Sequence, residues 1–298
     1  MIADSRRRTT SRRDLARNPR FEQISPEVGE LDEAAVSEGI LDDPDGVLAL
    51  LADLAGATDQ RLRDLARRLA GRLFLDLARR GPSARRGIDR IVEQPYRPDG
   101  GDLDLDASFD AIAEAIAGGT ALDVERLRVR SWTTADTALC LLIDRSGSMG
   151  GKPLATAAVA AACIALRNPR SYSVLAFGKD VVAVKSQRAD KSSERVVTDV
   201  LSLRGHGTTD VAGALRAAAD QLGRSRATRK IAIVLSDCRA TVEGDAHEAA
   251  AMLSEIVVVA PKDDCDEAVR FARECGARFV TVDGPTRVVE ALAVVLER

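Results

Sequence analysis

Three oxygen-bearing side chains follow one another at alternate positions from residue 144, and together they can hold a divalent cation. Asp144, Ser146 and Ser148 come directly after an apolar run at residues 138–143. A short apolar run that ends in a polar, glycine-bearing loop predicts a buried parallel strand with a site at its carboxyl end. A buried carboxylate without a partner costs free energy, so a cation should neutralise Asp144. Hydroxyl and carboxylate oxygens favour a hard divalent ion.

Two later stretches place similar side chains at expected strand ends. A glycine-rich loop at residues 205–210 contains Thr208 and Thr209 and precedes a predicted helix, and the apolar strand at 231–235 leads into Asp237. The first and fourth strands of such a sheet can be neighbours at its switch point, where their two terminal carboxylates repel each other unless a cation or a proton lies between them. The nearby hydroxyl groups favour the cation. Thr208 and Thr209 are both candidate ligands, and we favour Thr209 because of its spacing from the following helix.

Strands and helices alternate from residue 137 onward, which predicts a mostly parallel sheet with helices on both faces. The expected strands are 137–144, 171–177, 181–185, 230–236, 255–260 and 278–283, and the expected helices are 154–167, 191–203, 210–223, 245–254, 264–275 and 285–297. Only Gly178–Asp180 separates the second strand from the third, which predicts a hairpin. The expected fold class is therefore α/β, a doubly wound and mostly parallel sheet with one antiparallel edge strand.

A helical N-terminal region is expected over residues 21–130, before the α/β half at 131–298. Asp43 and Pro44 predict one helix start, because an acidic cap and a proline in the first turn are typical of that position, and Thr58–Asp59 predicts another. An amphipathic stripe follows the second start and should pack against a neighbouring helix. The stripe consists of Leu62, Leu65, Leu69, Leu73 and Leu77.

Weaker patterns lie on either side of these helices. Residues 1–20 carry seven arginines among serines and threonines, which predicts a basic, flexible tail. We expect a helix at 27–38, a loop with a short helix at 83–103, and an edge strand at 127–132.

Three aspartates at alternate positions precede a further expected helix. Asp102, Asp104 and Asp106 lack the glycine and the distant glutamate of a calcium-binding EF-hand loop. An extended link into a helix near 107–117, with Asp106 or Ser108 near its cap, explains them better.

Composition excludes several classes of protein. Charged residues make up 30% of the 298 residues but nearly balance at a net charge of -3, and aromatic residues make up only 3%. These values argue against binding of nucleic acid, both through bulk charge and through base stacking. The five cysteines form no C-x-x-C pair, which favours reduced thiols in the cytoplasm. Neither a secretory signal nor an apolar run long enough for a membrane span is present.

The order D-x-S-x-S, threonine in a glycine-rich loop, and aspartate at the end of an apolar strand resembles the metal-ion-dependent adhesion site (MIDAS) of von Willebrand factor A (VWA) domains. The resemblance covers residues 131–298. It implies that one Mg²⁺ or Mn²⁺ is held by five residues, Asp144, Ser146, Ser148, Thr209 and Asp237. In that family the two serines, and in some states the threonine, bind the ion directly, and the aspartates act partly through water. Neutral hydroxyl ligands leave most of the cation's charge available, so such a site binds an acidic residue of a partner protein.

The region before this domain resembles the corresponding part of bacterial intracellular CoxE-like proteins. A helical stretch leads there into Gly-Asp-Leu-Asp-Leu-Asp, residues 101–106. CoxE-like proteins work beside MoxR-type AAA+ ATPases. The resemblance therefore implies an adaptor that works with such an ATPase in protein complex assembly or cofactor insertion.

Two other functions are weighed against the adaptor. The loop at 146–153 fails as a phosphate-binding loop because Lys152 is followed by Pro153 and its glycines are wrongly spaced. A metal-dependent hydrolase or phosphatase could use Asp144 as a nucleophile. No second acid follows two residues later, however, and His206 in the metal loop is better explained as an exposed contact. We therefore expect a binding protein and not an enzyme.

Overall fold

The computed structural model describes residues 9–81, 90–96, 102–119, 121–133, 137–146, 150–205, 207–242 and 244–296. The chain forms two compact units. One comprises Met1–Ser83, Ala138–Arg226 and Lys230–Arg298, and the other comprises Ala84–Thr137 and Ala227–Arg229. This division differs from the boundaries expected from the sequence, because the first five helices fold into the same unit as the α/β half.

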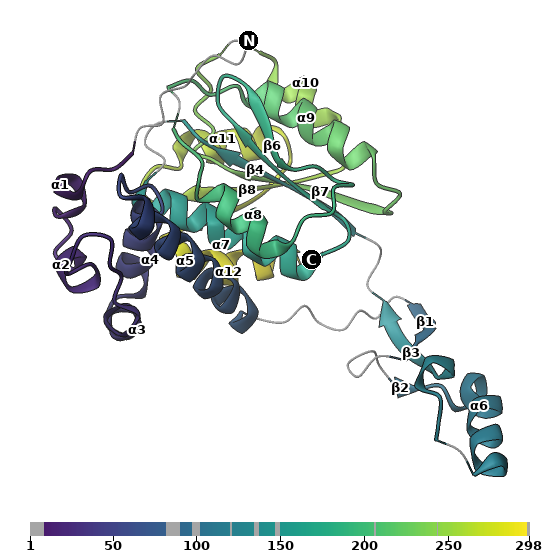
Figure 1. Ribbon diagram of the computed structural model, residues 1–298. Coiled ribbons are helices and arrows are strands. Elements are labelled where there is room, and N and C mark those ends of the chain that lie inside the picture. The colour runs from purple at the N-terminus through teal and green to yellow at the C-terminus, as the bar shows by residue number, and fades with distance from the viewer. Residues whose placement is uncertain are drawn as a thin grey trace, which may run out of the picture. The chain divides into compact units, whose positions relative to one another are not determined.

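A six-stranded sheet forms the centre of the larger unit (Figure 1). Its strands are β4 (Thr137–Asp144), β5 (Tyr172–Phe177), β6 (Val181–Lys185), β7 (Arg229–Leu235), β8 (Glu255–Pro261) and β9 (Arg278–Val282). The strand order is β6-β5-β4-β7-β8-β9, so β4 and β7 are neighbours. β5 pairs in parallel with β4 and antiparallel with the edge strand β6, while β8 pairs in parallel with β7 and β9. The expected α/β fold class is confirmed.

Helices cover both faces of this sheet (Figure 1). They are α7 (Gly151–Arg167), α8 (Ser193–Val200), α9 (Val211–Gly223), α10 (Ala246–Ala251), α11 (Asp266–Glu274) and α12 (Pro285–Leu296). α7, α8 and α12 lie on one face, and α9, α10 and α11 lie on the other. Every residue from Leu154 to Ala165 of α7 is buried. A helix that is apolar all round must be covered on all sides, so α7 needs a second layer beyond the sheet.

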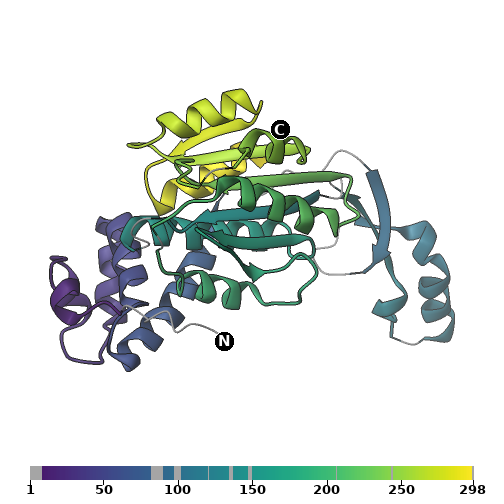
Figure 2. The same ribbon diagram turned by 90° about the horizontal axis from the view of Figure 1, so that it is seen from above.

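The N-terminal helices supply that second layer (Figure 2). They are α1 (Arg12–Leu15), α2 (Phe21–Ile24), α3 (Glu33–Asp42), α4 (Pro44–Leu54) and α5 (Gln60–Arg80). Asp43 and Asp59 cap α4 and α5 by accepting hydrogen bonds from the N–H groups of Gly46 and Leu62, at 2.9 and 2.7 Å. Both predicted helix starts are therefore confirmed. The helix expected at 27–38 begins and ends further along the sequence, as α3 at Glu33–Asp42. α4 and α5 pack against α7, and their leucines join the core of the α/β half.

The smaller unit contains a sheet of its own. It consists of β1 (Arg90–Pro95), β2 (Asp102–Leu103), α6 (Leu105–Gly118), a 3-10 turn at Val124–Arg126, and β3 (Arg128–Thr133). The strand order is β1-β3-β2, and β3 pairs antiparallel with both neighbours. The edge strand predicted at 127–132 is therefore wrong, because β3 is central. The loop with a short helix predicted at 83–103 is also wrong in its described part, which contains β1 and the whole of β2.

Asp104 caps α6, one turn before the position that the sequence indicated. One of its carboxylate oxygens accepts a hydrogen bond from the N–H of Ala107 at 3.1 Å, and the other accepts one from Nε of Arg130 at 2.6 Å. The aspartate therefore serves as a helix cap and an ion-pair partner.

All five cysteines are free thiols, and Cys140, Cys163 and Cys238 are buried. Among the helices in the described ranges, none is both long and apolar enough to cross a membrane.

A shared core predicts that damage to α4 destabilises the sheet as well. Leu51 is completely buried in α4 and belongs to the same apolar cluster as Ile143 of β4, whereas Leu41 of α3 is 88% exposed. We expect Leu51→Ala to lower the free energy of unfolding by about 2–5 kcal/mol because it leaves a cavity. The control Leu41→Ala should change it by less than about 0.5 kcal/mol. Urea unfolding followed by circular dichroism measures both values.

Hydrogen exchange of β4 separates this shared core from two independent parts. In Leu51→Ala, the amides of β4 should lose protection together with those of α4. If the β4 amides of the variant stay as protected as in wild type while those of α4 lose protection, α4 and β4 do not unfold as one unit, which would contradict the shared core.

Candidate metal centre

The ends of two neighbouring strands bring the first and third sequence elements together. β4 is buried up to Ile143 and ends at the half-buried Asp144, and β7 leads at Leu235 directly into Ser236 and Asp237. Both segments are apolar because helices cover both faces of the sheet, so the polar residues begin where the strands emerge. The predicted adjacency of the two carboxylate-bearing strand ends is therefore observed.

Hydrogen bonds from both strand ends hold the Asp144 carboxylate in place. Its Oδ1 accepts a hydrogen bond from the backbone N–H of Ser146 at 2.7 Å, and its Oδ2 accepts one from the hydroxyl of Ser236 at 2.5 Å. The Ser146 hydroxyl also lies close enough to lower the pKa of Asp144. Asp144 is thus tied to its own loop and to the loop that follows β7.

Ser236 is the residue of this centre that the sequence did not single out as functional. Its side chain is buried, and its hydroxyl oxygen also accepts a hydrogen bond from the N–H of Cys238 at 2.8 Å. Its position directly before Asp237 at a strand end is the signal that could have identified it. Cys238 turns the chain away with a φ of 60°, a left-handed value that residues with a Cβ adopt rarely. The hydroxyl of Ser236 therefore links Asp144 to this turn.

In the part of the chain that the structure describes, no cationic side chain pairs with either of these two carboxylates. Burial raises the pKa of Asp144, and the negative charge of Asp237 raises it further. Within the described ranges, neither carboxylate forms an ion pair. The nearest arginines in sequence are engaged elsewhere, because Arg145 donates to the carbonyl of Asp180 and Arg239 pairs with Asp264. A bound cation would remove this repulsion, so the set of oxygen atoms fits a divalent metal.

The thiol of Cys238 does not add a charged ligand to this set. Burial, together with the charges of Asp237 and Asp144, raises its pKa to about 12. The thiolate is the form that binds metals and acts as a nucleophile, so this thiol remains protonated and inert near neutral pH.

The threonine loop is fastened to the loop that carries Asp237. Thr209 is buried; its N–H donates to the hydroxyl of Thr241 at 2.8 Å, and its carbonyl accepts from the N–H of Thr241 at 3.0 Å. Asp210 follows and caps α9 by accepting a hydrogen bond from the N–H of Gly213 at 2.8 Å. Thr208 is only half-buried. The choice of Thr209 over Thr208 stays a prediction that this geometry favours.

The structure thus joins Asp144 to Ser146 directly, and it links Asp144 through Ser236 to the loop that carries Asp237, to which Thr209 is fastened through Thr241. Ser148, the remaining predicted ligand, lies outside the described residues, as does His206.

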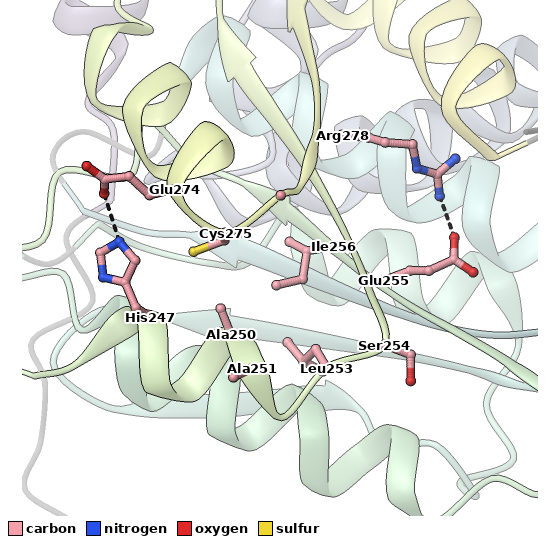
Figure 3. A pocket seen from close by; sticks show the side chains of 11 residues that line it. His247, Ala250, Ala251, Leu253, Ser254, Glu255, Ile256, Glu274, Cys275 and Arg278 are labelled. Atoms are coloured by element: carbon pink, nitrogen blue, oxygen red, sulfur yellow. Dashed lines mark hydrogen bonds and ion pairs between the residues drawn. The ribbon is translucent and has the colours of Figure 1, made fainter.

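A hollow of about 350 Å³ lies at the amino ends of the strands, opposite the metal centre, where β8 begins at Glu255 and β9 begins at Arg278 (Figure 3). Two charge pairs line it. His247 contacts Glu274 at 2.7 Å, and Arg278 contacts Glu255 at 2.8 Å. These groups satisfy one another, and they stand at the amino ends of the strands. Sites in open α/β sheets lie at the carboxyl ends, so the metal centre remains the candidate functional site.

Comparisons with known proteins found one matching family and several similar solved structures. The family described as VWA domain containing CoxE-like protein matches residues 77–268. Among solved structures, the chain is similar to a von Willebrand factor type A protein from Catenulispora acidiphila, with 18% identity and a TM-score of 0.44 over 56% of this chain and 43% of that one. It is also similar to BatB from Bacteroides thetaiotaomicron, with 16% identity and a TM-score of 0.41 over 54% and 96% of the two chains.

A third similar structure is the manganese-loaded TRAP protein of Plasmodium vivax, with 16% identity and a TM-score of 0.41 over 53% of this chain and 74% of that one. No curated protein matches the chain. The match to the Catenulispora protein covers less than half of that protein's length.

The bridging position of Ser236 yields a prediction about stability. Ser236→Ala should lower the free energy of unfolding by about 1–3 kcal/mol, because it leaves the buried N–H of Cys238 and Oδ2 of Asp144 without a partner. Ser202→Ala is the matched control, since Ser202 lies in the turn after α8 and its exposed hydroxyl bonds only the carbonyl of Thr198 in the described structure. Urea unfolding in the presence of a chelator measures both variants without any contribution from metal. Equal stability of the two variants would contradict the bridging role.

Proposed function

The chain belongs to the VWA domain-containing CoxE-like family, and we propose that it is a metal-dependent adaptor that binds an acidic residue of a partner protein. The observation that carries this proposal is the pair of carboxylates, Asp144 and Asp237, which no cationic side chain of the described protein neutralises. The hydroxyl of Ser146 beside them adds a neutral oxygen ligand. A cation held mainly by neutral oxygens keeps enough charge to attract a further carboxylate.

Each proposed ligand has a stated task. Asp144 and Asp237 supply negative charge, and Ser146, Ser148 and Thr209 supply hydroxyl oxygens. Mg²⁺ or Mn²⁺, when bound, supplies the positive charge that a partner's carboxylate requires. The hydrogen bonds from Ser146 and Ser236 orient the Asp144 carboxylate. Thr241 fixes the backbone of Thr209, so the hydroxyl-bearing loop stays beside the loop of Asp237.

We propose binding and not catalysis because the candidate nucleophile is already engaged. Both oxygens of Asp144 accept hydrogen bonds from protein donors, which lowers their nucleophilicity. The neighbouring Cys238 thiol is held in its protonated form. These interactions suit a residue that organises a cation better than one that attacks a substrate.

The proposed partner is a MoxR-type AAA+ ATPase, and the proposed process is protein complex assembly or cofactor insertion. The support is the resemblance to CoxE-like proteins, which work beside such ATPases. We infer a cytoplasmic location from the five free thiols, three of them buried, because unpaired cysteines are typical of reducing compartments.

Metal binding is tested by titration calorimetry of the full chain with Mg²⁺ and with Mn²⁺. Wild type should bind one ion. Asp144→Ala should lose more affinity than the roughly 10–100-fold typical of removing a residue that only supports a ligand. Asp245→Ala is the control, because Asp245 is also a turn aspartate but caps α10. Wild-type affinity in Asp144→Ala would exclude this site.

The partner is tested with an immobilised full chain and a purified MoxR-type AAA+ ATPase. Mg²⁺ is kept constant throughout, because a chelator would also disturb the nucleotide site of the ATPase. Wild type and Asp245→Ala should retain the ATPase to the same extent, and Asp144→Ala should not retain it. If all three proteins retain the ATPase equally, the ATPase does not bind through the metal centre, which would contradict the proposed mode of binding.

A further inference from the structure

The helix that follows the metal loop begins without a cap of its own. An N-cap side chain normally accepts a hydrogen bond from the second or third N–H group of a helix. The residue before α7 is Gly150, which has no side chain, and the third residue of the helix, Pro153, has no N–H. The N-terminus of α7 therefore depends on an acceptor from elsewhere in the protein.

Asp53, in the last turn of α4, provides this acceptor. Its Oδ1 accepts a hydrogen bond from the N–H of Gly151 at 2.6 Å, across 98 positions of sequence. The two glycines make the approach feasible. A Cβ on Gly150 would lie 3.0 Å from Oδ1 of Asp53, and Gly151 adopts a φ of 52°, which favours glycine.

The contact lies at one end of the segment that carries the proposed serine ligands. The other end is held where Oδ1 of Asp144 accepts the N–H of Ser146. Ser148 lies between these two fixed points in the sequence. The Asp53 contact therefore fixes Gly151, the residue at which this segment ends and α7 begins.

α4 makes a second contact of the same kind, away from the metal loop. Oδ1 of Asp45 accepts a hydrogen bond from the N–H of Thr286 at 2.9 Å, at the start of α12. Gly284 permits it with a φ of 117°, and a Cβ there would lie only 2.5 Å from the other carboxylate oxygen. Asp45 and Asp53 are both half-buried and lie about 12 Å apart along α4. One helix thus caps two others, and only one of these begins beside the proposed ligands.

We propose that Asp53 is a positioning residue of the metal centre, and that the N-terminal helices are therefore a structural part of that centre. The proposal rests on the proposed function, in that the segment after Asp144 binds a cation. Asp53 acts through the N–H of Gly151 and sets where the loop ends. Asp45 provides a matched comparison, because it makes the same kind of contact with a helix that carries none of the proposed ligands.

Hydrogen exchange without metal tests the positioning independently of any metal binding. Asp53→Ala should speed exchange in peptides that cover Asp144–Gly151 and leave those that cover Gly284–Val288 unchanged. Asp45→Ala should give the opposite pattern. Wild-type exchange of Asp144–Gly151 in a folded Asp53→Ala would overturn the proposal.

Calorimetry with Mg²⁺ then tests the consequence for the centre. Asp53→Ala should bind Mg²⁺ at least about 10-fold more weakly, as is typical when a residue that orients a ligand is removed. Asp45→Ala should lose thermal stability without losing affinity. Asp53→Asn keeps an acceptor oxygen and should restore the affinity. Equal weakening in Asp45→Ala and Asp53→Ala would reduce the role of Asp53 to general stability and overturn the proposal.

The two experiments also separate this proposal from the function on which it rests. If wild type binds neither Mg²⁺ nor Mn²⁺, the proposed function fails, and the exchange patterns alone decide whether Asp53 positions the loop. If wild type binds metal and Asp53→Ala binds it equally well, the proposed function stands and the positioning role fails.

Discussion

The candidate metal centre depends on the burial of one carboxylate, Asp144, at the end of a strand, with the negative charge of Asp237 beside it. Asp144 ends β4 and Asp237 follows β7, and burial makes their proximity more costly than it would be in water. The protein eases that cost with donors of hydrogen bonds, the N–H of Ser146 and the hydroxyl of Ser236, and among the described residues no cationic side chain pairs with Asp144. The arginines nearby in sequence, Arg145 and Arg239, turn to other partners. Such an arrangement supports the proposal that a cation from solution compensates this charge.

The second organising feature is a helix that is buried on every side. α7 packs against the sheet on one face and against α4 and α5 on the other, so its sequence is rich in alanine and contains no polar stripe over Leu154–Ala165. This burial makes the N-terminal helices part of the same unit as the sheet. It also brings α4 close to the start of α7, where Asp53 supplies the cap that Gly150 cannot. Core packing and the proposed metal centre are therefore connected through one helix.

The regions where sequence expectations failed are those in which strands pair over long distances. β1 and β3 pair with each other although about 35 residues separate them, and the alternating pattern at 127–132 indicates only that one face of a sheet meets solvent. It does not tell how many neighbours the strand has, so a central strand was taken for an edge strand. By contrast, the helix starts at Asp43 and Asp59 were predictable because a capping aspartate bonds an N–H three residues away.

The sequence by itself determined the alternation of strands and helices after residue 137, the hairpin at Gly178–Asp180, and the types of residue that stand at the strand ends. These features depend on local periodicity and on turn chemistry, which a single sequence carries. Only the tertiary structure decided that Ser236 reaches Asp144 and that Asp53 caps α7. These contacts join residues about 90 to 100 positions apart. They arise from the packing of α4 on α7 and from the order of strands in the sheet. Neither of these features produces a periodic pattern of residues in the sequence.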